Sequence, residues 1–118
     1  MKYLLLGYPK CSTCKKAIKF LDGKNIEYDF RDIVNNNPSS HELKKWINIY
    51  NHSINKYFNY SGNLYKSMNL KDKLPTMSDD EKISLLATNG MLVKRPLLIG
   101  DDFILIGFKI DEWNKYVK

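Results

Sequence analysis

The chain has 118 residues, 43% of them hydrophobic and 27% charged, with a formal net charge of +6. This length predicts one domain, residues 1–118. No stretch is apolar over the roughly 18 residues of a membrane span, and the apolar run before Gly7 is too brief for a secretory signal. We therefore expect a cytoplasmic protein with no membrane partner, in a compartment where a cysteine pair stays reduced unless it cycles.

Lysine dominates the basic residues, since only Arg31 and Arg95 are arginines among 19. Acidic residues are interspersed with the lysines, and no helix pattern carries one continuous basic face. This distribution is typical of a solvated surface with a mild attraction for anionic partners. We therefore expect no direct binding to nucleic acid.

The N-terminal part of the chain predicts a strand, a helix and a second strand. Residues 2–6 are almost continuously apolar, which is typical of a strand buried on both faces. The helix that follows has one apolar face, and Gly23 is expected to end it as the residue after its cap. Ile26, Tyr28 and Phe30 then alternate with charged residues, which predicts a strand with one buried face. Together these elements form a βαβ unit.

Residues 36–89 predict a helical insertion. Ser39 and Glu42 have capping-box spacing, and an apolar stripe follows them. The stripe consists of Leu43, Trp46, Ile47 and Tyr50. A second capping box, Ser78 to Glu81, opens a helix that Gly90 is expected to end. The aromatic and Asn-rich stretch between the boxes predicts one or two short helices.

The C-terminal part returns to strands and closes with a short helix. Two apolar runs, residues 96–99 and 103–106, flank Gly-Asp-Asp, which predicts an antiparallel hairpin. Gly107 is expected to break the second strand. Ile110 and Trp113 then mark the final helix.

The order of these elements predicts the fold class. A βαβ unit, a helical insert and a ββα unit give an α/β thioredoxin-like fold, with a mixed four-stranded sheet flanked by helices. Residues 1–35 and 90–118 are expected to form its core.

Cys11 and Cys14 are the only cysteines, and they form a C-x-x-C at a strand-to-helix junction, which is typical of a thioredoxin-like redox motif. Cys11 is expected just before the helix, where free backbone N–H groups lower a thiol pKa. Lys10, Lys15 and Lys16 are expected to add to this effect. Cys14 lies one helical turn further on. We therefore predict that Cys11 is the nucleophile and Cys14 the resolving cysteine.

Two other interpretations of the cysteine pair stay open. Structural zinc needs about four ligands, and only His41 and His52 could complete the set, at a spacing wider than that of a zinc finger, so we expect no metal. A purely structural pair is the simpler alternative, because Cys14 lies on the apolar face of its helix and could be a core residue.

Lys94-Arg95-Pro96, just before the hairpin, forms the second candidate element of the site. In thioredoxin-like folds a cis-proline precedes this strand and faces the cysteines. Arg95 is therefore a candidate oxyanion ligand, since a guanidinium binds oxyanions bidentately; the alternative is a surface charge. We predict that Arg95 and Pro96, with Ser12 and Thr13, bind the substrate.

These motifs resemble the arsenate reductase (ArsC) and Spx family of thioredoxin-like proteins over nearly the whole chain. The matching segments are residues 8–17, 58–62, 74–86, 90–97 and 106–108. The segment 90–97, Gly-Met-Leu-Val-Lys-Arg-Pro-Leu, is the most specific of them. The resemblance implies that Cys11 is the catalytic cysteine and that Arg95 holds the oxyanion.

The chain departs from the arsenate reductases at two positions. Those enzymes hold the oxyanion with three arginines; Arg95 matches one, and the other two fall at Ser61 and in the region 107–109. Losing two guanidiniums weakens the positive field for a doubly charged oxyanion and argues against efficient arsenate reduction. Cys14, in addition, stands where the glutaredoxin-dependent enzymes lack a cysteine.

The resemblance implies two candidate functions. The first is a thiol–disulfide oxidoreductase of an arsenate-reductase-like branch, acting on a small oxyanion or a disulfide. It would need no bound cofactor, only an external reductant such as a low-molecular-weight thiol or a thioredoxin system. The second is a Spx-like transcriptional regulator that binds the α subunit of RNA polymerase and is switched by a Cys11–Cys14 disulfide. The shorter chain, and a segment 58–62 that departs from the arginine-containing version of those regulators, lead us to expect the arsenate-reductase-like branch.

Overall fold

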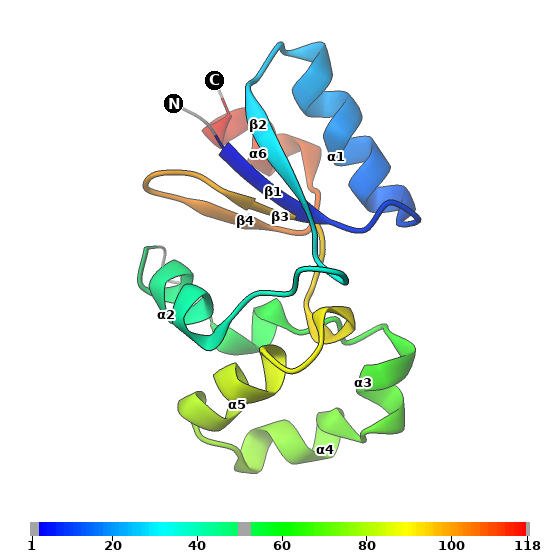
Figure 1. Cartoon of the computed structure of the whole chain (residues 1–118), viewed down its shortest axis with the longest axis vertical. Helices are drawn as coiled ribbons and strands as arrows, with labels where there is room; N and C mark the ends of the chain where they lie inside the picture. Colours follow the sequence, from blue (N-terminus) through cyan, green and yellow to red (C-terminus); the bar gives the residue numbers. More distant parts are fainter. Residues whose placement is uncertain (1–2, 50–52, 118) are drawn as a thin grey trace.

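A mixed four-stranded sheet lies at the centre of the computed structural model, which describes residues 3–49 and 53–117 (Figure 1). Its strands are β1 (Tyr3–Gly7), β2 (Tyr28–Asp32), β3 (Leu97–Ile99) and β4 (Ile104–Ile106), in the spatial order β2-β1-β3-β4. β1 pairs parallel with β2 and antiparallel with β3, and β3 and β4 form the antiparallel hairpin. The predicted α/β, thioredoxin-like architecture is confirmed.

Two helices, α1 (Ser12–Gly23) and α6 (Ile110–Tyr116), pack on one face of the sheet (Figure 1). Their apolar side chains share one buried cluster with β1 and β3, whose members include Leu5, Ala17, Leu21, Leu98 and Trp113. This cluster fixes the N-terminal end of α1 beside the end of β1. That junction carries the two cysteines.

The opposite face of the sheet packs against the helices between β2 and β3. These are α2 (Ser40–Ile49), η1 (Ile54–Tyr57), α3 (Asn63–Ser67), α4 (Leu70–Lys73), η2 (Leu74–Thr76), α5 (Asp79–Leu86) and η3 (Gly90–Leu92). Leu6 belongs to their core cluster, whereas Leu5 belongs to the other. Successive strand residues point to opposite faces, so β1 is buried on both, as predicted. Within the described residues, no helix is long and apolar enough to cross a membrane.

Both predicted capping boxes are present. At the first, the backbone N–H of Glu42 donates to the Ser39 hydroxyl, and the N–H of Ser39 donates to the Glu42 carboxylate, each at 3.1 Å. Ser78 and Glu81 make the same pair of bonds at the start of α5. Tyr50, predicted on the stripe behind the first box, lies outside the described residues.

Three contacts hold the helical segment against the sheet. The Arg31 guanidinium at the end of β2 donates to both Glu42 oxygens, at 2.6 and 2.9 Å. The backbone N–H of Lys94 donates to the carbonyl of Tyr57 at 2.7 Å. Gly90 is buried so closely that a Cβ there would lie 1.8 Å from the carbonyl oxygen of Ile33. The chain entering β3 is therefore held from two sides.

The predicted end of α1 was wrong. Gly23 is the last helical residue, and the residue after the cap is Asn25, in the left-handed region at φ 56°. The N–H of Asn25 donates to the carbonyl of Asp22, and that of Ile26 to Leu21, each at 3.1 Å. This is a Schellman motif, in which asparagine tolerates the left-handed conformation that glycine was expected to supply.

Two further predictions from the sequence were wrong. Phe30 does not join a buried face; it is 41% exposed because β2 is an edge strand. Gly90 does not end α5, which stops at Leu86, but begins η3. The final helix is present where Ile110 and Trp113 predicted it, and Trp113 is the residue that it buries.

Candidate active site

Cys11 is the N-cap residue of α1. Its extended backbone (φ −88°, ψ 120°) turns the chain from β1 into the helix, and its Sγ accepts a hydrogen bond from the N–H of Cys14 at 3.3 Å. Its own N–H donates to the carbonyl of Tyr8 at 3.0 Å. Cys11 thus holds its sulfur at the free N–H groups of the helix, a position that favours negative charge.

Cys14 lies one turn further into the helix and is completely buried. Its Sγ accepts a hydrogen bond from the N–H of Tyr8 at 3.4 Å. Gly7 leaves the space for this sulfur, since a Cβ on Gly7 would lie 3.2 Å from it. The two thiols are free, with Cys11 partly accessible and Cys14 shielded behind it.

The pKa values of the two thiols are shifted in opposite directions. Burial raises the pKa of Cys11, but hydrogen bonds from the Cys14 thiol and from the N–H groups of Cys14 and Thr13, together with the charge of Arg95, outweigh it, so the pKa lies below its usual value. Burial and the neighbouring Cys11 raise the pKa of Cys14 to about 12. The expected charge effect thus comes from Arg95, on another segment, and Lys10, Lys15 and Lys16 are exposed.

The Arg95–Pro96 peptide bond, which precedes β3, is cis. Pro96 is buried, and its carbonyl accepts the N–H of Gly107 at 2.8 Å. The Arg95 guanidinium lies 5.8 Å from the ring centroid of Tyr8, the residue that binds the Cys14 sulfur. Arg95 is therefore more than a distant surface charge, because its field reaches both cysteines.

Ser12 and Thr13, predicted to bind the substrate, lie in different surroundings. Ser12 is exposed, whereas Thr13 is partly buried and lines a cavity beside the cysteines. The N–H of Thr13 also helps to lower the pKa of Cys11. The structure therefore brings Thr13, Arg95 and Cys11 together and leaves the Ser12 side chain at the rim.

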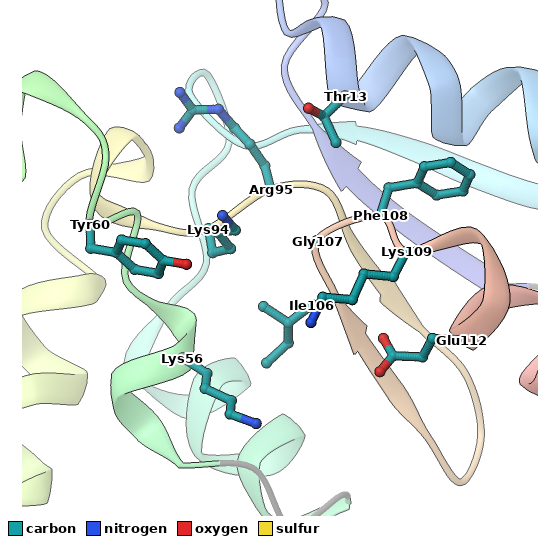
Figure 2. Close-up of a pocket in the computed structure, with 10 residues that line it drawn as sticks. All are labelled: Thr13, Lys56, Tyr60, Lys94, Arg95, Ile106, Gly107, Phe108, Lys109 and Glu112. Carbon is teal, nitrogen blue, oxygen red and sulfur yellow. The ribbon is translucent and has the colours of Figure 1, made fainter.

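The cavity beside Thr13 has a volume of about 340 Å³ and is lined by four cationic side chains. We call it the lysine cavity; its cations are Lys56, Lys94, Arg95 and Lys109. Tyr60 and Phe108 are the aromatic lining residues, and Glu112 is the carboxylate among them. In Figure 2 the Tyr60 ring lies beside Lys94, whereas the Phe108 ring points away from them.

Comparison with known proteins gives the chain its family. The ArsC family profile matches residues 6–116. The chain belongs to the ArsC family. It is 43% identical to the protein YusI of Bacillus subtilis over 98% of each chain, and 27% identical to the regulatory protein MgsR of the same organism, over 95% of this chain and 87% of MgsR. The crystal structure of an ArsC-family-related protein from Bacteroides fragilis superposes with a TM-score of 0.94, at 55% identity over 98% of this chain and 97% of that one.

The two positions that the resemblance assigns to further arginines of the arsenate reductases lie at two different cavities. Ser61 lines a second cavity of about 580 Å³, together with Asn59, Met91 and Arg95 among others. The region 107–109 lines the lysine cavity and contributes the amine of Lys109. Among the described residues, the second cavity therefore has one cationic lining residue, Arg95, whereas the lysine cavity has four.

No local pattern marks Lys56 and Lys109 as site residues, because they come from segments far apart in the chain. Lys94 belongs to the motif that contains Arg95. Within residues 3–49 and 53–117, no cluster of three or more His, Cys, Asp or Glu side chains could hold a metal ion. His52, considered as a zinc ligand, lies outside the described residues.

Proposed function

We propose that this ArsC-family protein is a thiol–disulfide oxidoreductase in which Cys11 is the nucleophile and Cys14 the resolving cysteine. The observation that carries the proposal is the placement of the two thiols: the partly accessible Cys11 sulfur caps α1 and accepts the N–H of Cys14, whose own sulfur is buried one turn behind it. The pKa of Cys11 is lowered, whereas that of the buried Cys14 is raised to about 12. A thiolate is the attacking species, so one sulfur is ready to react and the other is held in reserve.

The proposed reaction has two exchange steps. The Cys11 thiolate attacks one sulfur of a disulfide R–S–S–R, the S–S bond breaks, and R–S⁻ leaves while a Cys11–S–S–R bond forms. Cys14 then loses its proton to the leaving thiolate or to water and attacks the Cys11 sulfur, which releases the second R–S⁻. The substrate is reduced by two electrons, and an external dithiol or thioredoxin-type reductant restores the Cys11–Cys14 disulfide to two thiols.

The first step prepares the second. The Cys11 thiolate is itself one of the groups that raise the pKa of Cys14, through its hydrogen bond and its charge. Once Cys11 carries the substrate sulfur, both contributions are lost and only burial continues to oppose ionisation. Cys14 therefore becomes a better nucleophile when there is a mixed disulfide to resolve.

The substrate-binding roles follow from position. We propose that Arg95 and Thr13 hold the substrate against Cys11, that Pro96 sets their approach and that Ser12 lies at the rim. The same site could take a small oxyanion, because a guanidinium binds oxyanions. Arsenate reduction is the less favoured variant, since Arg95 is the one arginine that remains of the family's three.

Turnover measurements test the proposal. The reduced protein should reduce a small disulfide catalytically when a thioredoxin system is supplied, and the Cys11→Ser variant should not. Arsenate and disulfide should be assayed side by side, with the Cys11–Cys14 reduction potential, which decides whether the pair acts as a donor or an acceptor. Absence of turnover in the wild-type protein with every reductant would overturn the proposal.

A second candidate is a redox-switched regulator. The similarity to the regulatory protein MgsR favours it, since the match covers 87% of that protein. In this case a Cys11–Cys14 disulfide would alter binding to the α subunit of RNA polymerase in the cytoplasm. A pull-down of polymerase by the oxidised and reduced forms tests it: stoichiometric, redox-dependent binding without turnover favours the regulator, and no binding in either form eliminates it.

A further inference from the structure

Four cationic residues and one carboxylate, Glu112, line one cavity at the edge of the cysteine site. Lys56 comes from η1, Lys94 and Arg95 from the chain before β3, and Lys109 from the N-cap of α6. None of them forms an ion pair with a described residue. Like charges gathered at one site repel each other, and an anionic ligand relieves this repulsion.

We propose that the lysine cavity binds the anionic end of an organic disulfide, so that the preferred substrates carry carboxylate or phosphate groups on the part that does not react. The proposal rests on the thiol–disulfide activity inferred above and names the substrate class. Neutral or cationic disulfides react at the same sulfur but gain nothing from the cavity.

Two contacts fix the position of Lys94. The backbone N–H of Lys94 donates to the carbonyl of Tyr57 at 2.7 Å, and the Lys94 Nζ lies 5.0 Å from the ring centroid of Tyr60. In Figure 2, Lys94 and Tyr60 lie together on one side of the cavity, and the side chain of Lys109 extends toward Ile106 on the other. An anion between Lys94 and Lys109 is contacted by an amine on each side and by the ring of Tyr60.

The size of the cavity favours an organic group over a bare oxyanion. Its volume of about 340 Å³ lies at the small end of the range of sites for small organic ligands, about 300–1,000 Å³. A tetrahedral oxyanion would fill only a small part of it. Tyr60 supplies the apolar contact that an organic chain needs.

Two residues connect the lysine cavity to the reactive sulfur. Thr13, in the first turn of α1 behind the N-cap residue Cys11, lines the cavity, and Arg95 lines it too and lowers the pKa of Cys11 by its charge. A disulfide whose charged end lies among the lysines therefore extends past Thr13 toward the Cys11 sulfur. In the exchange step Cys11 takes the near sulfur, the S–S bond breaks, and the far half leaves as a thiolate.

The test measures the rate constant for the reaction of the reduced protein with four disulfides. These are bis(2-hydroxyethyl) disulfide (neutral), dithiodipropionate (carboxylate), oxidised coenzyme A (phosphate) and cystamine (cationic). Each rate is divided by the rate of the same disulfide with free dithiothreitol, which removes differences in leaving group. The variants are Lys94→Gln, Lys109→Gln and the double variant, with Lys45→Gln as control. Lys45 is exposed on α2, outside the cavity, and its replacement changes the net charge equally.

The normalised rates should favour an anionic disulfide over the neutral one by about tenfold, a typical gain from local charge. Each cavity variant should lose a few-fold of this preference and the double variant most of it, whereas Lys45→Gln keeps it. The larger of the carboxylate and phosphate preferences identifies the source of the anion. Equal preferences in the wild-type, cavity-variant and control proteins would overturn the inference. Absence of reaction with all four disulfides would instead overturn the proposed activity itself.

Discussion

The backbone N–H of Cys14 points at the Sγ of Cys11 from 3.3 Å. This contact links the two cysteines before any disulfide forms. Cys14, whose own sulfur is buried, stabilises negative charge on the Cys11 sulfur through its backbone N–H. It depends on the N-cap position of Cys11, and hence on the turn between β1 and α1.

Cys11 should be alkylated faster than Cys14 at neutral pH. Its thiolate is stabilised by hydrogen bonds, whereas burial and Cys11 raise the pKa of Cys14 to about 12. Iodoacetamide labelling followed by peptide mass spectrometry, repeated across pH, should give an apparent pKa for Cys11 below that of an ordinary thiol, about 8.5. Equal rates at both cysteines would contradict the account.

Replacing Cys14 with alanine should raise the pKa of Cys11 without restoring an ordinary value. The variant removes the thiol that donates to Cys11, but the N–H groups of residue 14 and of Thr13 stay in place. The pH profile of Cys11 alkylation should therefore shift toward higher pH, but the apparent pKa should stay below that of an ordinary thiol. An unchanged profile would mean that the side-chain hydrogen bond contributes nothing.

Replacing Arg95 with glutamine should also raise the pKa of Cys11, by a smaller amount, because the charge of Arg95 is the weakest of the effects that lower it. Arg31→Gln is the matched control. It removes the other arginine, which binds Glu42, and should leave the Cys11 profile unchanged. A shift of equal size in both variants would indicate an effect of net charge and not of position.

Gly90→Ala should prevent stable folding or destabilise the protein by several kcal/mol. The new Cβ would lie 1.8 Å from the Ile33 carbonyl, and neither backbone segment can move without breaking the core. Gly23→Ala is the control, since no atom lies within 4 Å of its Cβ and it ends α1 with a helical backbone. It should stabilise by about 0.5–1 kcal/mol in urea unfolding. Similar effects at both sites would contradict this packing.

The Arg31–Glu42 pair should make stability fall in acid. The Arg31 hydrogen bonds lower the pKa of Glu42 to about 2 from an ordinary 4.5. Its contribution is present at neutral pH and is lost as pH falls from about 4.5 toward 2. Glu42→Gln should cost about 1 kcal/mol at pH 7, and its melting temperature should converge with the wild type in acid. A gap that is constant across pH would show that the charge is not involved. Asp80→Asn is the control, since its pair with Lys44 is exposed, and no change is expected.

The sequence was informative wherever a local pattern has one structural meaning. The change from the apolar run of β1 to the one-sided apolar pattern of α1, the two capping boxes and the Gly-Asp-Asp hairpin are all set by neighbouring residues. All are present in the structure. The prediction about Phe30 failed because only the strand order shows that β2 is an edge. The left-handed residue after the helix cap is Asn25 and not Gly23. The sequence could not distinguish them, because both residue types tolerate the left-handed conformation.

The site was harder to predict because it is built from distant segments. Cys11 and Cys14 could be located from their spacing alone. The charge that acts on them belongs to Arg95, which the fold brings near them from the chain before β3. Lys56 and Lys109 are separated in the chain by most of the helical segment, and no local pattern marks them. Only the three-dimensional arrangement places their amines at one cavity.

The most direct test of the central claim is to trap the mixed disulfide. Reduced Cys14→Ser and Cys11→Ser variants are each treated with a small disulfide, and intact-protein and peptide mass spectrometry locate the added group. The account predicts that Cys14→Ser accumulates one adduct at Cys11, that Cys11→Ser stays largely unmodified, and that the wild-type protein passes on to the Cys11–Cys14 disulfide. An adduct that forms as fast on Cys14 as on Cys11 would contradict the assignment of nucleophile and resolving cysteine.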